Sequence, residues 1–474
     1  MADTLWKLSA VELARAVHSG ELAPSQIVEA VIARYTETEP HLNAFATFDA
    51  EGARETARQL DARPLDELAK LPLAGVPFSV KDLIPTKGLE NGCGSFTRIG
   101  SIPDHDAVAV KRMRDAGAVL LGKTTTPEFG SKAITHSLRH GYTRNPWDLE
   151  RTPGGSSGGA AAALAAGVGP VAISTDGAGS SRFPASCCGI LGMKATIGAL
   201  PNDYIESRFV NFQGVGINAR TSCDMALLFS VMNGPEDRDP WSLVTQKRTV
   251  NVSPSPASQV RGLRVMSFPR FSNTYLHPEV ERLFTQALAR LVSWGGELIT
   301  GPVDFDWAPT ASVAALTSSM AARFGDLIDR SEHEVDPVIK LALEIGRSQT
   351  AEAVARAPIQ RTQLFERVQE LFQDADIIAS PTLAAPPVPF DQNPLEPLVV
   401  DGREIGTLRD EWTPYGGVFN QTGHPAISIP AGFTSDGLPV GIQIAGRYNT
   451  EQLLLDLAAA MEQETKWPES WPKI

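Results

Sequence analysis

The stretch GGSSGGAAAALAAGVGPVAISTDGAGSSRFPASCCGILGMKAT, residues 154–196, decides the fold of this chain. It opens with six small residues. An Ala-rich run then predicts a helix over 157–167, and the β-favouring run 170–175 predicts a strand. A second turn of small residues, 176–181, follows that strand directly. A helix of Ala and Gly lets neighbouring backbone come very close, so we expect a tightly packed helix that runs into a strand.

Further helices and strands are predicted to alternate on both sides of this stretch. The predicted helices cover 9–18, 24–37, 50–62, 105–116, 278–293, 311–330, 351–373 and 450–463. The predicted strands lie within 71–84, 118–123, 262–268, 296–300, 374–383, 426–432 and 439–446. This alternation predicts an α/β fold with a central mixed β-sheet covered by helices on both faces. No linker or repeat divides the chain, so we expect one domain over 1–474, with 200–370 as a variable, mainly helical elaboration.

The composition excludes several functional classes. Of the 474 residues, 42% are hydrophobic and 20% charged, an ordinary globular balance. The net charge of −13 argues against nucleic acid or a membrane surface as a partner, because both attract clustered Lys and Arg. The N-terminus fits an amphipathic helix and not a signal peptide. The most apolar stretch, 158–173, contains Pro170 and is too short to span a bilayer.

Cysteine and histidine usage predicts a cytoplasmic protein without a metal. The four cysteines lack CxxC spacing and secreted-scaffold density, so we expect reduced thiols at Cys93, Cys187, Cys188 and Cys223. Only His136 and His140 have the spacing of metal ligands, and no acidic or Cys cluster lies near them in sequence. We expect no cofactor and no metal, and a monomer or a homodimer.

Lys81 is the first candidate for chemistry. It ends the apolar run 76–80, where burial would lower the pKa of the amine and let it accept a proton. The alternative interpretation is an ion pair with the neighbouring Asp82 or a side chain that extends to the protein surface.

The two runs of small residues are the other candidates. The run 154–159 lets a substrate approach the backbone closely, or it is a loop in which Ser157 caps the helix that follows. The run 175–182 follows a predicted strand, and ligands bind at the carboxyl ends of strands in α/β sheets. Its backbone N–H groups can point at a developing oxyanion, with Ser180 placed to attack the same carbonyl. An ordinary glycine turn is the alternative.

Together the three places resemble the amidase signature family. That family's pattern reads GGSSGG, an Ala-rich helix, a short strand and a D-x-G-G-S-x-R turn, which 154–196 follows closely. The spacing also agrees, because Ser156 comes 75 positions after Lys81 and Ser180 comes 24 positions after Ser156. GVPFSVKD (75–82) and NQTGHPAISIP (420–430) match further landmarks. A composite motif with fixed spacing is far more specific than a lone glycine loop.

The resemblance implies a hydrolase of carbon–nitrogen acyl bonds. Ser180 would be the nucleophile, Ser156 the bridging serine and Lys81 the base, with a cis peptide bond between Gly155 and Ser156. The implied oxyanion and substrate-binding positions are Gly155 and the backbone N–H groups of Gly177, Ala178, Gly179 and Ser180.

Two positions depart from the family pattern. Ala178 stands where glycine is usual, and its N–H serves the oxyanion hole provided that its φ is negative. Ser181 stands where a β-branched aliphatic residue is common and adds a rival hydroxyl. The choice of Ser180 therefore rests on spacing.

Three other functions are alternatives. A glutaminase subunit of a tRNA-dependent amidotransferase would need an acidic residue where Thr413 stands, although Asp410 and Glu411 lie close by in a shifted register. An α/β-hydrolase elbow at G154-x-S156-x-G158 would need a preceding strand and partners such as Asp376 and His424. A nucleotide-binding protein would use the glycine turns at helix starts, but the fingerprint spacing is missing.

The substrate is predicted only by class. We expect 200–370 and the loop 130–144 to line the pocket, and their aromatic residues and Met favour apolar or aryl groups. The resemblance implies linear amides, anilides or carbamates (urethanes), because the same attack on a carbonyl next to nitrogen cleaves all three.

Overall fold

The computed structural model describes residues 2–299, 301, 305, 307 and 310–474. An eleven-stranded sheet runs through it in the order β1-β3-β2-β6-β8-β7-β14-β15-β11-β9-β10. Its strands are β1 (Phe45–Phe48), β2 (Pro77–Lys81), β3 (Val119–Thr124), β6 (Val171–Asp176), β7 (Leu191–Lys194), β8 (Gly214–Ala219), β9 (Arg264–Ser267), β10 (Glu297–Ile299), β11 (Ile377–Pro381), β14 (Ala426–Phe433) and β15 (Pro439–Gly446). Two small hairpins lie outside it, β4 (His136–Ser137) with β5 (Gly141–Tyr142) and β12 (Leu398–Val400) with β13 (Arg403–Gly406).

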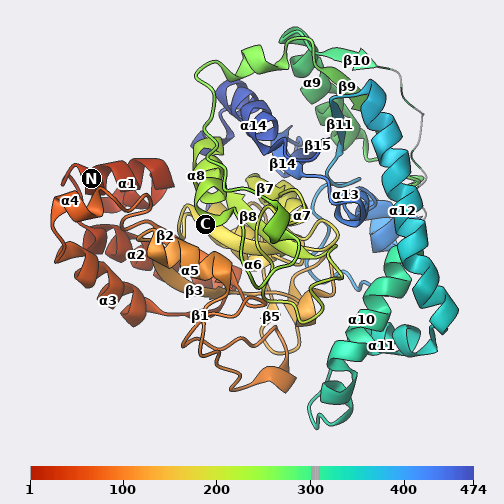
Figure 1. Cartoon of the computed structure of the whole chain (residues 1–474), viewed down its shortest axis with the longest axis horizontal. Coiled ribbons are helices and arrows are strands. Elements are labelled where there is room, and N and C mark those ends of the chain that lie inside the picture. Colours follow the sequence, from red (N-terminus) through yellow and green to blue (C-terminus); the bar gives the residue numbers. More distant parts are fainter. Residues whose placement is uncertain (1, 300, 302–304, 306, 308–309) are drawn as a thin grey trace.

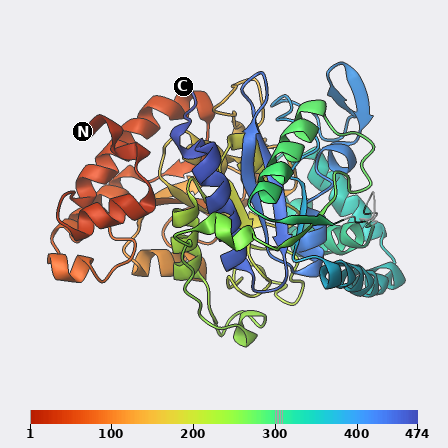
Figure 2. The same cartoon turned by 90° about the horizontal axis from the view of Figure 1, so that it is seen from above.

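The sheet is mixed, as predicted. β2 pairs in parallel with β3 and β6, and β9 pairs in parallel with β10 and β11. The remaining pairs are antiparallel, and they join these two parallel groups into one sheet. Helices flank the sheet on both faces (Figures 1 and 2), which confirms the predicted α/β architecture.

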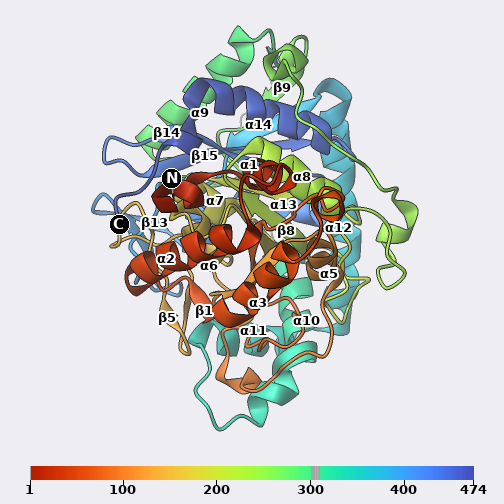
Figure 3. The same cartoon turned by 90° about the vertical axis from the view of Figure 1, so that its left-hand side faces the viewer.

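The helices follow the sequence periodicity closely. The longer ones are α1 (Ala10–His18), α2 (Pro24–Leu42), α3 (Ala50–Asp61), α5 (Val108–Asp115), α6 (Gly158–Ala165), α8 (Ser222–Met232), α9 (Pro278–Ser293), α10 (Thr310–Asp329), α11 (Pro337–Ser348), α12 (Ala351–Asp374) and α14 (Glu451–Thr465). Figure 3 shows α1, α2 and α3 lying together on one side of the molecule, where α3 packs on β3. Among the residues that the structure describes, no helix is both long and apolar enough to cross a membrane.

Helix α6 is the tightly packed helix that the Ala-rich run predicts, and it lies in the core. All eight of its residues are buried, and it packs against β2, β3, β6 and α7 (Arg182–Cys188). A Cβ at Gly159 would lie 2.3 Å from Thr125 Oγ1, so only glycine fits at this position. A helix that is apolar on every side is stable only when it is enclosed, which places the two flanking glycine turns inside the protein.

The range 200–370 contains the two predicted strands and one further strand, β8, in addition to its helices. All three strands, β8, β9 and β10, belong to the central sheet, where β10 is a mainly exposed edge strand paired with β9. Residue 300, which the strand predicted within 296–300 includes, lies outside the described residues. The helical part is α8 to α12, and α10 and α11 project together at one end of the molecule (Figure 1). A small apolar cluster of their own, separate from the main core, holds these two helices together.

Candidate active site

The turn after β6 is shaped by the carboxylate of Asp176. Asp176 accepts the N–H of Gly179 at 2.7 Å and the N–H of Ser181 at 3.1 Å, which folds 176–181 back on itself. Gly179 has a φ of +113°, a conformation that L side chains rarely adopt. A Cβ at this position would also lie 2.2 Å from the Phe183 ring. This turn therefore requires glycine at position 179.

A buried ion pair stabilises the turn. The guanidinium of Arg182 donates twice to Asp176, at 3.0 and 2.9 Å, and both side chains are fully buried. Burial by itself would raise the pKa of Asp176, but the charge of Arg182 and the hydrogen bonds to the carboxylate lower it well below its usual range. Arg182 also donates to Asn420 and Gln443, so it ties the turn to the C-terminal part of the chain. The sequence motif contains Arg182, but the sequence alone does not show this positioning role.

The structure separates the two neighbouring serines. The Ser181 side chain is fully buried, and its Oγ lies 2.7 Å from Ser174 Oγ in β6. Ser180 is only half-buried, and its hydroxyl makes no hydrogen bond to any described residue. This geometry favours Ser180 as the hydroxyl that meets a substrate.

Lys81 lies at the end of β2, buried and next to three hydroxyl groups. Its Nζ lies 2.6 Å from Ser156 Oγ, and it lies 2.9 Å from the hydroxyls of both Ser157 and Thr175. Burial lowers the pKa of Lys81 well below its usual value, and the charge of Asp176 opposes this only in part. A neutral amine in contact with a serine hydroxyl can accept its proton.

The alternative in which Lys81 pairs with its neighbour Asp82 is wrong. Asp82 instead faces Lys123, with 3.8 Å between the carboxylate and Nζ, and accepts backbone N–H groups of Gly92 and Gly94. The two lysines at the ends of β2 and β3 are therefore in different surroundings. Lys123 faces a carboxylate, whereas the hydrogen bonds of Lys81 to described residues all go to neutral hydroxyls.

Ser156 follows a cis peptide bond from Gly155, as the family resemblance implies. The next residue, Ser157, stands at the N-terminal end of α6, but its side chain does not cap the helix. Its hydroxyl instead accepts from Lys81 and donates to the Thr175 carbonyl at 3.3 Å, so the predicted capping role is wrong. Thr175 and Ser157 are thus contacts of the amine that sequence reasoning missed. The signal available for Thr175 was a polar side chain at the end of a buried strand.

Three backbone N–H groups of the turn are open to a substrate oxygen. The N–H groups of Gly177, Ala178 and Ser180 donate to no described residue, and these three residues are half-buried or exposed. Ala178 has no positive φ, which meets the condition set from the sequence. The N–H of Gly179 differs, because Asp176 already accepts it. Directed N–H groups beside a hydroxyl form an arrangement that can stabilise an oxyanion.

The catalytic triad of an α/β-hydrolase is not assembled. His424 is buried, its ring nitrogens lie 2.9 Å from Thr422 Oγ1 and 3.3 Å from Gln369 Nε2, and burial lowers its pKa to about 3. Asp376 instead forms an ion pair with Arg264. These contacts exclude His424 and Asp376 as partners of a nucleophile at Ser156.

No metal-binding cluster of three or more His, Cys, Asp or Glu side chains occurs among the described residues. His136, one of the two histidines with metal-like spacing, lies 3.2 Å from Lys132 Nζ and stacks on Tyr142.

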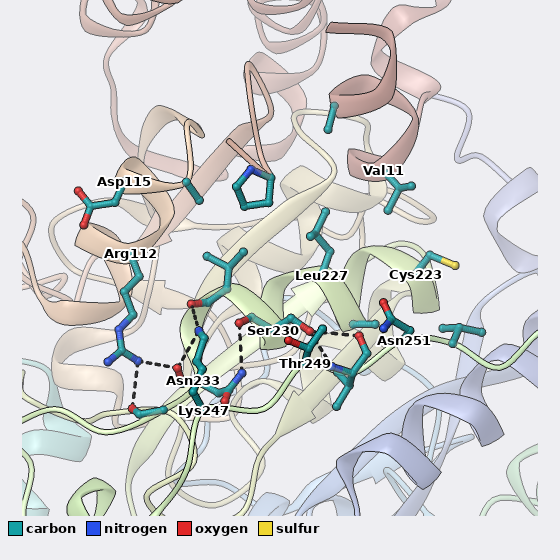
Figure 4. Close-up of a pocket in the computed structure, with 18 of the residues that line it drawn as sticks. Val11, Arg112, Asp115, Cys223, Leu227, Ser230, Asn233, Lys247, Thr249 and Asn251 are labelled. Carbon is teal, nitrogen blue, oxygen red and sulfur yellow. Dashed lines mark hydrogen bonds between the residues drawn. The ribbon is translucent and has the colours of Figure 1, made fainter. Parts of the chain in front are cut away.

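A separate hollow of about 1160 Å³ lies between α1, α5, α8 and the segment 247–252 (Figure 4). None of the proposed catalytic residues lines it. Two of its cations are already engaged, because Arg112 donates to the carbonyls of 232–235 and Lys247 donates to those of Val231 and Asn233. They thereby satisfy the carboxyl end of α8, where helix carbonyls lack internal partners.

Comparison with known proteins agrees with this fold. The amidase family model matches residues 26–455. The chain is 36% identical to an acylamidase of Rhodococcus erythropolis over 98% of this chain and 97% of that protein. It is 32% identical to a glutamyl-tRNA(Gln) amidotransferase subunit of Roseiflexus sp. (strain RS-1) over 99% of both chains. The solved structure of a bacterial aryl acylamidase superposes with a TM-score of 0.88 at 27% identity, covering 98% of each chain.

The chain belongs to the amidase signature family. It is an amidase-signature enzyme that hydrolyses the carbon–nitrogen bond of amides.

Proposed function

We propose that this enzyme is a stand-alone amidase that cleaves linear amides, anilides and carbamates through an acyl-enzyme on Ser180. The observation that carries the proposal is the contact between Lys81 and Ser156, 2.6 Å in a fully buried site beside the turn that presents Ser180. The likeness to an acylamidase and an aryl acylamidase supports the substrate class.

Proton transfer in this proposal runs along the three side chains. Neutral Lys81 accepts the Ser156 proton while Ser156 accepts the proton of Ser180, whose Oγ attacks the carbonyl carbon. The free N–H groups of the turn donate to the oxyanion that forms. The proton then returns through Ser156 to the leaving nitrogen, the carbon–nitrogen bond breaks, and water cleaves the acyl-enzyme by the same route.

The glutaminase alternative is less well supported by the contacts near position 413. Glu411 accepts the backbone N–H groups of Thr274 and Tyr275 at 2.8 and 2.9 Å, so its carboxylate is already engaged. Asp410 bonds Thr407 at the start of its own turn. Thr413 itself has no charge with which to bind the ammonium of glutamine. The shifted register therefore does not supply the acidic partner that glutamine would need.

The test is a substrate panel with covalent labelling. We expect turnover of a simple aliphatic amide, of acetanilide and of an aryl carbamate, and little turnover of glutamine. A serine-directed sulfonyl fluoride should label Ser180, identified by peptide mass spectrometry. Labelling at another serine, or hydrolysis of glutamine alone, would overturn the proposal.

A further inference from the structure

A loop next to Ser156 connects the candidate site to helix α10. A Cβ at Gly130 would lie 3.3 Å from Ser156 Oγ, so this part of the loop lies next to the proposed bridging serine. The preceding residue, Phe129, has a φ of +49°, which is rare for a bulky side chain and is found where the surroundings impose it. Its ring stacks on Phe324 of α10, with 4.1 Å between the ring centroids. Phe129 thereby fixes the position of α10 beside the site.

The residue before Phe324 is Arg323, and its side chain pairs with Glu206 of another loop. Its guanidinium lies 4.6 Å from the centroid of the Phe324 ring, and its Nε donates to Glu206 at 2.6 Å. Glu206 belongs to the loop that precedes β8. The end of this loop lies beside the turn 176–181, because a Cβ at Gly177 would lie 2.9 Å from Gln213 Cγ. Arg323 therefore links α10, which packs on the loop next to Ser156, to the loop that contacts Gly177.

The charge of Arg323 also acts on Tyr204, a second residue of that loop. The hydroxyl of Tyr204 interacts with Thr175, which in turn contacts the amine of Lys81. Burial raises the pKa of Tyr204, and the positive charge of Arg323 acts in the opposite direction. The guanidinium is thus near enough to Tyr204 to act on it electrostatically.

The guanidinium of Arg323 has N–H groups that donate to no described residue. Only Nε is used, so the four N–H groups of the terminal nitrogens donate to no residue that the structure describes. The Arg323 side chain is 19% exposed, whereas its partner Glu206 is 74% exposed. An ion pair with so exposed a partner is weak and easily exchanged. Partly desolvated guanidinium donors bind carboxylates in a fork geometry better than any other side chain does.

We propose that Arg323 is a specificity-determining residue that binds a carboxylate on the substrate, so that the enzyme prefers amides bearing an anionic group near the scissile bond. This inference rests on the proposed amidase function and names the substrate class of the same site. Glu206 holds the guanidinium in place between turnovers and competes with the substrate for it.

The test compares charged and neutral substrates of equal shape. 4-Acetamidobenzoate and 4-nitroacetanilide differ in a planar carboxylate or nitro group on the amine side of the bond. N-Phenylsuccinamate and N-phenyl-4-methylpentanamide differ on the acyl side, where a carboxylate replaces a branched alkyl end of the same shape. The quantity measured is kcat/KM of each variant relative to the unaltered enzyme, so the intrinsic reactivity of each substrate cancels.

Arg323→Gln should lower kcat/KM about 10- to 100-fold for at least one carboxylate substrate, as expected for a lost charge-assisted hydrogen bond, and less than about 3-fold for its neutral counterpart. Arg323→Lys should give an intermediate loss, because it keeps the charge without the fork. Glu206→Gln should act in the opposite direction and raise kcat/KM about 3-fold for the same charged substrate, because the competitor is gone. Arg330→Gln is the matched control, since this arginine is adjacent to the same helix but 81% exposed.

Equal losses on charged and neutral substrates would overturn the proposal, as would losses of the same sign in the Arg323 and Glu206 variants. Both results would assign the ion pair a purely structural role. Turnover of the neutral substrates without any turnover of the charged ones would refute this inference and leave the amidase function standing. If no substrate were cleaved, the proposed function itself would fail.

Discussion

The two adjacent serines allow a sharp test, because the structure predicts opposite consequences for two otherwise identical substitutions. Ser180→Ala removes a half-buried hydroxyl that bonds to no described residue, so stability should change little. If Ser180 is the nucleophile, kcat should fall by roughly 10⁴- to 10⁶-fold. Ser181→Ala removes a fully buried hydroxyl 2.7 Å from Ser174 Oγ, so the cost should appear in stability instead.

The size of the Ser181 effect follows from burial. Leaving the Ser174 hydroxyl without its partner costs about 1–3 kcal/mol. For a chain of 474 residues the unfolding entropy is on the order of 1 kcal/mol/K, so Tm should fall by about 1–3 °C. The catalytic rate should stay within about 10-fold of the unaltered enzyme, because the hydroxyl faces the sheet.

The assay pairs kcat on acetanilide with a thermal melt, and mass spectrometry of the acylated enzyme identifies the modified serine. The reasoning would be refuted if Ser181→Ala abolished turnover, or if Ser180→Ala retained it. An acyl group found on Ser181 would refute it equally.

The other predictions concern the base, the turn and the ion pair. The reaction needs neutral Lys81, and burial lowers the pKa of this amine, so the rate should rise with pH and level off well below pH 10.5. A pH–rate profile that falls from pH 6 to 9 would contradict this role. Lys81→Arg should lower the rate by about 10²- to 10⁴-fold. Gly179→Ala forces a side chain into a conformation with φ of +113° and against the Phe183 ring, so calorimetry should show a loss of roughly 1–3 kcal/mol with reduced kcat, whereas an unchanged melt would show that the turn relaxes freely. Arg182→Leu leaves Asp176 buried without its partner and should cost about 3–5 kcal/mol in chemical denaturation, with native-like stability as the contrary result. The pKa of Asp176 is lowered in the folded state, so its contribution to stability is complete above about pH 4 and is lost as the pH falls below that value, which acid titration of the melting temperature measures.

The sequence alone predicted the fold class and the family correctly, and it named the residues of the proposed site. Each rests on local patterns: hydrophobic periodicity sets the elements, and the continuous motif 154–196 carries two of the proposed catalytic residues with the turn between them. The all-small helix α6 was predictable because only a fully enclosed helix lacks a polar face. The spacing from Lys81 to this motif then brought in the third residue, and the structure places its amine 2.6 Å from Ser156.

Only the tertiary structure decided which polar groups are already engaged. Sequence separated Ser180 from Ser181 by motif spacing alone, because the side-chain directions of adjacent residues depend on the folded turn. It could not show that Asp82 faces Lys123, or that Glu411 binds the backbone at Thr274, because these contacts join segments far apart in the chain. The same holds for Arg323, which meets its partner across 117 positions. Local sequence sets which elements form, whereas packing between elements decides which charges remain available for a substrate.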